Sequence, residues 1–508
     1  MPRARPRRGD ASGSREEIAG ARRLGRRILD LTLAHTLGAA GDRAWSGSGR
    51  ARVARRLAAP PPIRGGSERR AMERLQAVFR DSMRMSHPRL FGLFTPAPLP
   101  IAALADMAAA FLNQSPDAWK AGPAATEVEA GMLRTFTRLL GWGAGSFGAV
   151  TSGGGGANLL ALKMARDRAL GIGARRRGVG RRAAGRLRVY ASDQAHFSIA
   201  RALDILGIGS NALVTLPTGR DRRLDPDRLD AALRRDRRRG WRPMAIVATA
   251  GTTGTGTLDP LPDIAACARR HAAFLHVDAA YGGALLFSRR NRGRLAGLDR
   301  ADTVTIDPHK WLFQPFSLAV LLARDRERLR ASCAVEPDYL RKDLEHEPDR
   351  LDLYQHSLEG SRPFRALKLD LTLRRLGMDG LGDLVDHTME LARRLERRVQ
   401  ADPRFETCGA PVDLSTVVLR YLPAWARGDR RPRARAGAPE PRRPAGARRR
   451  LDRLQRRIQH AVERGGEAWF PAIVLDGEVW LRIGVFNYRT TEKDIDRLLR
   501  AIVRAAGE

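Results

Sequence analysis

Cysteine is scarce in this sequence, and its positions exclude two common structural devices. The 508 residues include only Cys267, Cys333 and Cys408, which lie far apart. They match neither a disulfide framework nor a zinc-ligand spacing, so we expect no metal ion. Unpaired cysteines also favour a reducing compartment, and we predict a cytoplasmic protein.

Long hydrophobic runs are missing as well. No apolar run approaches the roughly 20 residues that a membrane-spanning helix needs, so we expect no membrane association. An apolar segment does not follow Arg7 and Arg8, and acidic residues appear early, at Asp10 and Glu16. We therefore interpret the arginine-rich start as a frayed terminus and not as a targeting signal.

Acidic residues are few relative to basic ones: 56 against 91, for a formal net charge of +35. Much of this charge lies in three arginine-rich stretches, at residues 1 to about 70, 173–188 and 427–457. The latter two lack the interleaved aromatic residues on which bases stack. Arginine also dominates predicted helix exteriors, which is as consistent with compositional bias as with selection for a polyanion, and we keep nucleic-acid binding as a distant alternative.

The chain begins with two predicted helices ahead of any sheet. Residues 15–40 and 68–85 carry apolar residues at helical spacing, and the proline-rich residues 59–63 separate them. We interpret residues 1–85 as a tail followed by an arm that packs on a partner.

A glycine-rich segment follows two further predicted helices, at residues 101–113 and 124–140. A short strand reaches Val150, four glycines occupy positions 153–156, and a helix is expected to begin near Ala157. A strand, a glycine loop and a helix start together form an arrangement that binds phosphate through backbone N–H groups. The alternative is a plain hinge, since neither the Walker pattern nor GxGxxG is present.

Strand-like and helix-like segments then alternate, which predicts an α/β fold with a mostly parallel sheet. The expected strands are residues 187–191, 244–249, 274–277 and 304–306. Polar residues follow the strand ends, where open α/β sheets bind ligands. They are His196, Thr252, Thr253, Asp278 and Lys310.

These residue types suggest one cofactor. A lysine such as Lys310 attacks a carbonyl only when neutral, and burial near other cations lowers its pKa. A buried Asp278 requires a cation such as a protonated pyridine nitrogen, and His196 can stack on a flat ring. Singly, each residue has an ordinary reading, as a strand-end cap, a surface histidine or a solvated lysine. Together they indicate pyridoxal 5'-phosphate.

Longer motifs support that reading. HVDAAYGG at residues 276–283 and DPHKW at 307–311 closely resemble the pyridoxal-phosphate-dependent group II amino-acid decarboxylases. Further similar segments run from PAATEVE at residue 123 to LRIGVFNYRTTEKDID at residue 481, and include TSGGGGANLLAL, SDQAHFSIARA and TAGTTGTGTLDP.

The resemblance implies a fold of the PLP-dependent transferase type, aspartate aminotransferase-like (fold type I). Residues 86–368 would form a large domain around a mostly parallel seven-stranded sheet. Residues 369–508 would form a small α+β domain with an arginine- and proline-rich insertion near 427–450. The resemblance also implies a homodimer, with interlocking N-terminal helices.

Site roles follow from the same resemblance. Lys310 would form the Schiff base with the cofactor, Asp278 would pair with the pyridine nitrogen, and His196 would stack on the ring. The glycines at 154 and 155 would hold the phosphate. Thr253 would lie near the cofactor and His309 near the phosphate.

Tyr339 matches a mobile-loop tyrosine that helps to protonate the substrate carbon after carbon dioxide leaves. A tyrosine at this position favours decarboxylation of an L-amino acid to the amine. A carbon–carbon lyase or an aldehyde synthase on the same scaffold remains the alternative.

The chain also departs from the family pattern. Gly155 and Gly156 stand where serine and an acidic or small residue are usual, so a hydroxyl bond to the phosphate is lost and we expect weaker cofactor retention. Asp370 replaces a frequent tryptophan, and Leu93 and Asp117 replace aromatic residues of aromatic-specific members. The substrate is therefore not determined by the sequence.

Overall fold

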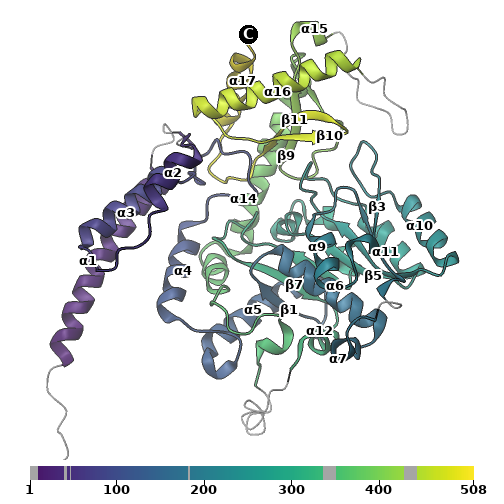
Figure 1. Ribbon diagram of the computed structural model, residues 1–508, viewed down its shortest axis with the longest axis horizontal. Coiled ribbons are helices and arrows are strands. Elements are labelled where there is room, and N and C mark those ends of the chain that lie inside the picture. The colour runs from purple at the N-terminus through teal and green to yellow at the C-terminus, as the bar shows by residue number, and fades with distance from the viewer. Residues whose placement is uncertain are drawn as a thin grey trace, which may run out of the picture.

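Two β-sheets organise the structure, a computed structural model that describes residues 10–38, 43–45, 47–180, 184–335, 350–427 and 443–507. Helices cover both sheets, and a helical arm projects from the body (Figure 1). Within the described part, no helix is both long and apolar enough to cross a membrane.

The larger sheet has seven strands in the order β1-β7-β6-β5-β4-β2-β3. Strand β7 is antiparallel to both of its neighbours, and the remaining pairs are parallel. This arrangement confirms the predicted α/β fold with a mostly parallel seven-stranded sheet. The strands are β1 (Phe147–Thr151), β2 (Leu187–Ser192), β3 (Leu213–Leu216), β4 (Arg242–Thr249), β5 (Phe274–Asp278), β6 (Thr303–Ile306) and β7 (Ala319–Ala323).

Helices pack on both faces of this sheet, because the strand residues that point to one face and those that point to the other are both apolar. In β4, Ile246 and Ala248 join one core cluster, while Ala245 and Val247 join the other. The first cluster packs against α5 (Pro123–Leu139), α10 (Pro226–Arg238) and α11 (Leu261–Arg270). The second packs against α6 (Gly154–Leu170), α9 (Ser198–Ile205) and α12 (Arg326–Cys333).

A smaller antiparallel sheet lies in the C-terminal part, in the order β10-β11-β9-β8. Its strands are β8 (Phe405–Thr407), β9 (Thr416–Tyr421), β10 (Ala472–Leu475) and β11 (Glu478–Gly484). Helix α14 (Leu367–Ala401) runs between the two sheets and is interrupted at Gly377, where φ is 71°. The other C-terminal helices are α15 (Ala424–Arg427), α16 (Ala445–Gly465) and α17 (Glu492–Ala506).

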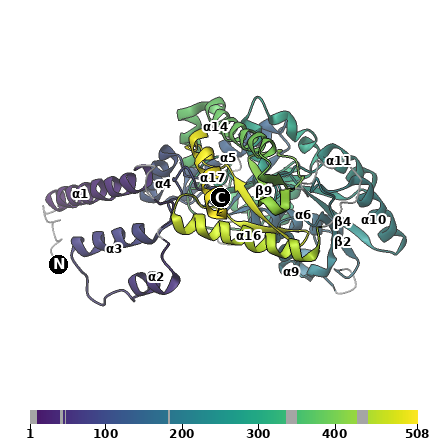
Figure 2. The ribbon, with the colours of Figure 1, turned by 90° about the horizontal axis from the view of Figure 1, so that it is seen from above.

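The N-terminal arm consists of α1 (Asp10–Leu37), α2 (Arg50–Leu57) and α3 (Glu68–Asp81). Figure 2 shows α1 and α3 side by side, extending away from the body. Arg27 lies 2.5 Å from Glu68, and the ring of His35 stacks on Phe79. Helix α4 (Pro100–Leu112) then leads into the body and packs on α14.

Short helical segments complete the fold. Helix α7 spans Ala174–Arg177. Short 3₁₀ helices occur at η1 (Trp119–Ala121), η2 (Ser210–Ala212), η3 (Gly282–Phe287), η4 (Arg292–Leu295), η5 (Leu298–Arg300) and η6 (Leu353–His356).

Three sequence predictions require correction. Helix α6 begins at Gly154 and not near Ala157, so three of the glycines form its first turn. Helix α2 lies in the arginine-rich link between the two predicted arm helices, where we expected extended chain. Helix α16 begins at Ala445, inside the insertion expected to extend to about residue 450, because its apolar residues Ile458 and Val462 pack on the small sheet. The domain boundaries at residues 85 and 368 stay predictions.

Candidate active site

A cavity of about 220 Å³ lies at the carboxyl edge of the large sheet. Adjacent parallel strands end level with one another there: Thr249 pairs with Asp278, and Asp278 pairs with Thr305. Six of the predicted site residues line the cavity: Gly154, Gly155, His196, Thr253, Asp278 and Lys310. Residues that were not assigned to the site also line it: Phe94, Asn158, Thr249, Gly251, Ala280, Tyr281 and Asp307.

Lys310 lies just past β6, where Pro308 ends the strand. Its Nζ is 3.0 Å from Oδ2 of Asp307, and the two side chains are 25% and 2% exposed. Burial lowers the pKa of Lys310, but Asp307 and then Asp278 outweigh it, so the pKa is raised. The expectation of neighbouring cations that lower this pKa was therefore wrong, because the immediate neighbours of the amine are carboxylates.

Asp278 ends β5 and is 6% exposed. Its Oδ2 accepts a hydrogen bond of 2.8 Å from Nδ2 of Asn158. Its Oδ1 accepts one of 3.1 Å from the backbone N–H of Ala280. The carboxylate is therefore held in one orientation at the cavity wall, where it can pair with a cationic ring nitrogen.

His196 lies in the loop between β2 and α9. Its Nδ1 is 2.8 Å from Oγ of Ser198, and its ring centroid is 4.1 Å from that of Phe197. Burial lowers the pKa of His196, with Asp278 acting in the opposite direction. A neutral, flat ring at the cavity wall suits contact with the face of an aromatic ligand.

The glycine segment places the N-terminus of α6 at the cavity. The first N–H groups of a helix have no intrahelical acceptor, so those of Gly154 and Gly155 are available to an anion. A Cβ at Gly154 would lie 2.8 Å from Oδ2 of Asp307. This contact is too close for a side chain, so the position favours glycine. A Cβ at Gly155 would meet nothing closer than Cβ of Ser198, at 3.8 Å, so there a side chain fits.

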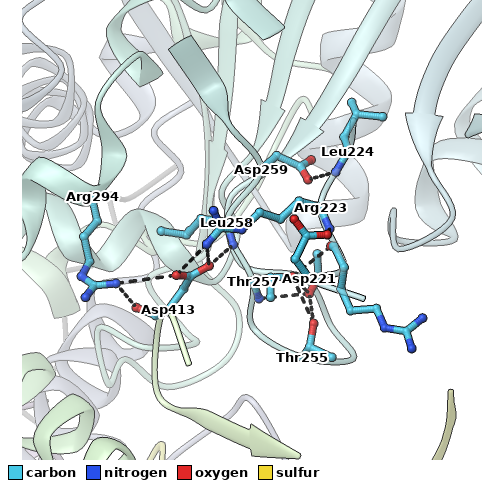
Figure 3. A network of polar contacts seen from close by, with 11 residues as sticks. Asp221, Arg223, Leu224, Thr255, Thr257, Leu258, Asp259, Arg294 and Asp413 are labelled. Atoms are coloured by element: carbon cyan, nitrogen blue, oxygen red, sulfur yellow. Dashed lines mark hydrogen bonds and ion pairs between the residues drawn. The ribbon is translucent and has the colours of Figure 1, made fainter. Parts of the chain in front are cut away.

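The loop after β4 carries Thr253 to the cavity through a buried polar network. Asp259 accepts hydrogen bonds from the backbone N–H groups of Thr249 and Leu224, at 2.7 and 2.8 Å. Asp413, beside the small sheet, bonds the N–H of Leu258 (Figure 3). These contacts hold both ends of the loop.

Thr252, in contrast, is fully buried in this loop. Its hydroxyl contacts those of Thr255 and Thr257, at 2.9 and 3.0 Å. It does not line the cavity, although it follows the same strand as Thr253. The expectation that it lies on the ligand-binding rim was wrong, because the loop turns back on itself and directs this side chain inward.

Of the two remaining predicted residues, only His309 lies in the described part of the chain, and it is not among the residues that line the cavity. His309 is buried beside the glycine segment, with its Cε1 4.0 Å from the Cβ position of Gly153. Its Nδ1 is 2.7 Å from the carbonyl oxygen of Leu318. Tyr339 lies outside the described residues.

Sequence reasoning missed several polar residues at or beside the site. Asn158 follows Gly154 by about one helical turn, and Asp307 precedes Lys310 by three residues, so spacing was the available signal. Arg482, on β11, is a buried cation whose Nη1 donates to the carbonyl oxygen of Thr253 at 2.7 Å. Arg482 had no such signal, because it lies on the other sheet and far along the chain from Thr253.

The donor set fits pyridoxal phosphate. Oδ1 of Asp307 and Oγ1 of Thr249 are buried without hydrogen-bond partners, so the cavity wall offers polar atoms to a ligand. A helix start suits the phosphate, Asp278 suits the ring nitrogen, and Lys310 suits the aldehyde.

Comparisons with known proteins agree. The family model described as "Pyridoxal-dependent decarboxylase conserved domain" matches residues 54–422. An L-2,4-diaminobutyrate decarboxylase from Rhizobium meliloti (strain 1021) is 36% identical over 428 residues, covering 84% of this chain and 79% of that protein. An aromatic-L-amino-acid decarboxylase from Bacillus atrophaeus is 29% identical over 433 residues, covering 85% and 84%.

A solved structure shows the same architecture. The crystal structure of Oryza sativa TDC with PLP and tryptamine superposes with a TM-score of 0.84 at 27% identity, covering 99% of each chain. The chain belongs to the pyridoxal-dependent decarboxylase family and is a pyridoxal 5'-phosphate-dependent carboxy-lyase that acts on an amino acid.

Proposed function

We propose that Lys310 carries the cofactor, that Asp278 pairs with its ring nitrogen and that His196 packs on its ring. The observation that supports these roles is the convergence of the three side chains on one cavity beside the start of α6. Bound pyridoxal phosphate supplies an electron-poor ring that draws electrons from the substrate as carbon dioxide leaves.

The phosphate is held by the backbone N–H groups of Gly154 and Gly155, with His309 beside this segment. Thr253 lines the cavity from the loop after β4. Asp278 would keep a proton on the ring nitrogen, because a buried carboxylate favours a cation beside it. His196 excludes water from one face of the ring.

Arg482 holds the substrate carboxylate in this proposal. Its side chain is buried, and its Nη1 and Nη2 donate to the backbone carbonyls of Thr253 and Gly92, whereas its Nε has no hydrogen-bond partner. No carboxylate pairs with it among the described residues. Its guanidinium lies 4.8 Å from the ring of Phe94, a cavity-lining residue. Burial lowers the pKa of Arg482 to about 10, which still leaves it cationic at neutral pH.

Tyr339 supplies the proton that replaces carbon dioxide, and the product is the amine. L-2,4-diaminobutyrate is the first substrate to test because the 36% identical relative is named for it. The experiment is carbon dioxide release from a panel of L-amino acids with added pyridoxal phosphate. Lys310→Ala should lose both activity and the visible absorbance of the bound cofactor; an unchanged spectrum would refute its assignment.

We further propose a homodimer in a cytoplasmic setting. The three cysteines are unpaired, which suits a reducing compartment. The projecting arm exposes apolar side chains that a second copy would cover. They are Ile18, Ile28, Leu33, Leu37 and Val78. Light scattering should give a dimer mass that Leu33→Arg together with Leu37→Arg reduces to a monomer; an unaltered dimer would exclude the arm as the interface.

A further inference from the structure

Asn158 is the meeting point of the polar contacts around the cavity. It is 1% exposed, on α6, and its amide contacts residues from three other elements. Its partners are Asp278 and His276 on β5, Thr305 on β6 and Ser198 on α9. This single side chain therefore joins the sheet to the loop that carries His196.

The orientation of the amide follows from its partners. Oδ1 of Asn158 accepts from the hydroxyl of Thr305 at 2.8 Å and faces Nε2 of His276 at 3.0 Å. Nδ2 then donates to Oδ2 of Asp278 at 2.8 Å. The flipped amide would place an oxygen against the carboxylate, where neither atom carries a proton.

His276 reinforces this orientation. Because Oδ1 of Asn158 only accepts, Nε2 of His276 must carry its proton. Its Nδ1, 2.9 Å from Oγ1 of Thr303, then accepts from that hydroxyl. Burial lowers the pKa of His276 to about 4, so this neutral tautomer persists at physiological pH.

The same direction continues towards His196. Nδ2 of Asn158 also donates to Oγ of Ser198, at 3.0 Å. The Ser198 hydroxyl can then donate to Nδ1 of His196, at 2.8 Å, and the backbone N–H of Ser198 points to the same nitrogen at 3.3 Å. Two donors on Nδ1 leave the ring proton on Nε2.

We propose that Asn158 is a positioning residue that sets the plane of the Asp278 carboxylate and, through Ser198, the tautomer of His196. The inference rests on the roles proposed above for Asp278 and His196. It connects Asp278 and His196 to one amide, so that both side chains are oriented before the cofactor binds.

The test compares Asn158→Leu, which keeps the approximate shape, with Asn291→Leu. Asn291 is also buried and donates to a carboxylate, that of Asp386 at 2.7 Å, but it does not line the cavity. The measurements are the cofactor dissociation constant, the pH dependence of the visible cofactor absorbance and the thermal unfolding midpoint.

Asn158→Leu should weaken cofactor binding about tenfold or more, the effect of losing one hydrogen bond to a charged group, and should displace the pH profile of the absorbance. Asn291→Leu should lower only the unfolding midpoint. If Asn158→Leu changes the cofactor constant and the pH profile no more than Asn291→Leu does, its role is purely structural and the proposal is wrong.

Ser198→Ala provides a second, milder variant that leaves the bond to Asp278 in place. ¹⁵N spectra of histidine-labelled protein, assigned with His196→Gln, should show His196 leaving the single Nε2–H tautomer. An unchanged His196 signal would overturn the link through Ser198. Asp278→Asn tests the proposed role of Asp278 separately. If this variant keeps the wild-type cofactor dissociation constant, that role is wrong. If Asp278→Asn weakens cofactor binding but Asn158→Leu does not, only the inference about Asn158 is wrong.

Discussion

Oδ2 of Asp307 lies 3.0 Å from Nζ of Lys310, and the same oxygen lies 2.8 Å from where a Cβ of Gly154 would be. The Asp307 carboxylate thus contacts the lysine and also leaves no room for a side chain at position 154. Attachment to an aldehyde needs a neutral amine, and Asp307 raises the pKa of Lys310. Cofactor loading is therefore expected to depend on this pair.

Asp307→Asn should make loading faster at neutral pH. Removing the carboxylate lowers the pKa of Lys310, so a larger fraction of the amine is neutral at a given pH. The pH of half-maximal loading rate should therefore fall below that of the wild type, as stopped-flow absorbance of the apoenzyme can measure. Asp379→Asn, in an exposed pair with Arg289, serves as the control. An identical pH profile for Asp307→Asn would contradict the prediction.

The glycine segment offers a matched pair of substitutions. Gly155→Ser has room for its side chain and can give the phosphate a hydroxyl donor, so the cofactor dissociation constant should fall about tenfold. Gly154→Ala would press on Asp307 and should raise that constant by a similar factor or more. Equilibrium dialysis measures both values. Equal effects of the two variants would show that the space beside these glycines does not govern retention.

Arg482→Met should impair substrate binding while leaving product binding intact. Loss of a hydrogen-bonded cation for the substrate carboxylate predicts a KM raised about 10- to 100-fold. The amine product has no carboxylate, so its inhibition constant should stay the same. If substrate and product weaken together, Arg482 acts through packing against Phe94 instead.

Tyr339→Phe tests proton delivery. Without the phenol hydroxyl, the substrate carbon should be protonated more slowly. In the presence of dioxygen, which accepts two electrons and becomes hydrogen peroxide, part of the substrate should then be released as aldehyde and ammonia. Mass spectrometry of the products distinguishes the two outcomes. Product that remains purely amine, formed at the wild-type rate, would remove Tyr339 from the reaction.

His356 should make the fold sensitive to acid. Burial first, then Arg326 and Arg330, lower the pKa of His356 from 6.5 to about 4. The unfolded chain takes up the proton below pH 6.5, but the folded chain does so only near pH 4. This residue's contribution to the free energy of unfolding is therefore lost as the pH falls, by about 2 kcal/mol between pH 7 and pH 5.

His356→Phe should reduce that loss, because phenylalanine keeps the ring that packs edge-on against Phe147 at 5.1 Å. Urea unfolding at pH 7 and pH 5 measures the difference. Exposed His460→Gln is the control and should leave the difference as in the wild type. The explanation fails if His356→Phe retains the full pH dependence.

Much of the fold was predictable because its signals are local. Apolar periodicity located α5 and β5 to within about two residues, and Pro308 marked the end of β6. The arm helix expected at residues 15–40 appears as α1. Helix α6 was misplaced because glycines have low helix propensity, which the tertiary setting overrides here.

The site was partly predictable for a related reason. In a parallel sheet, residues just past strand ends gather at one edge, so Asp278, His196 and Lys310 were expected together and do line one cavity. Arg482 comes from the other sheet, and no spacing along the chain relates it to Thr253.

The sequence by itself determined which chemical groups follow which strands, because strand ends, helix starts and motif spacing are local properties of the chain. Only the tertiary structure decided which of those groups touch. The strand order brought β5 and β6 together, so Asn158 could bridge Asp278 and Thr305, and the turn at Pro308 set a carboxylate against Lys310 where cations had been expected. Contacts across strands and between sheets depend on packing, which neighbours along the chain do not encode.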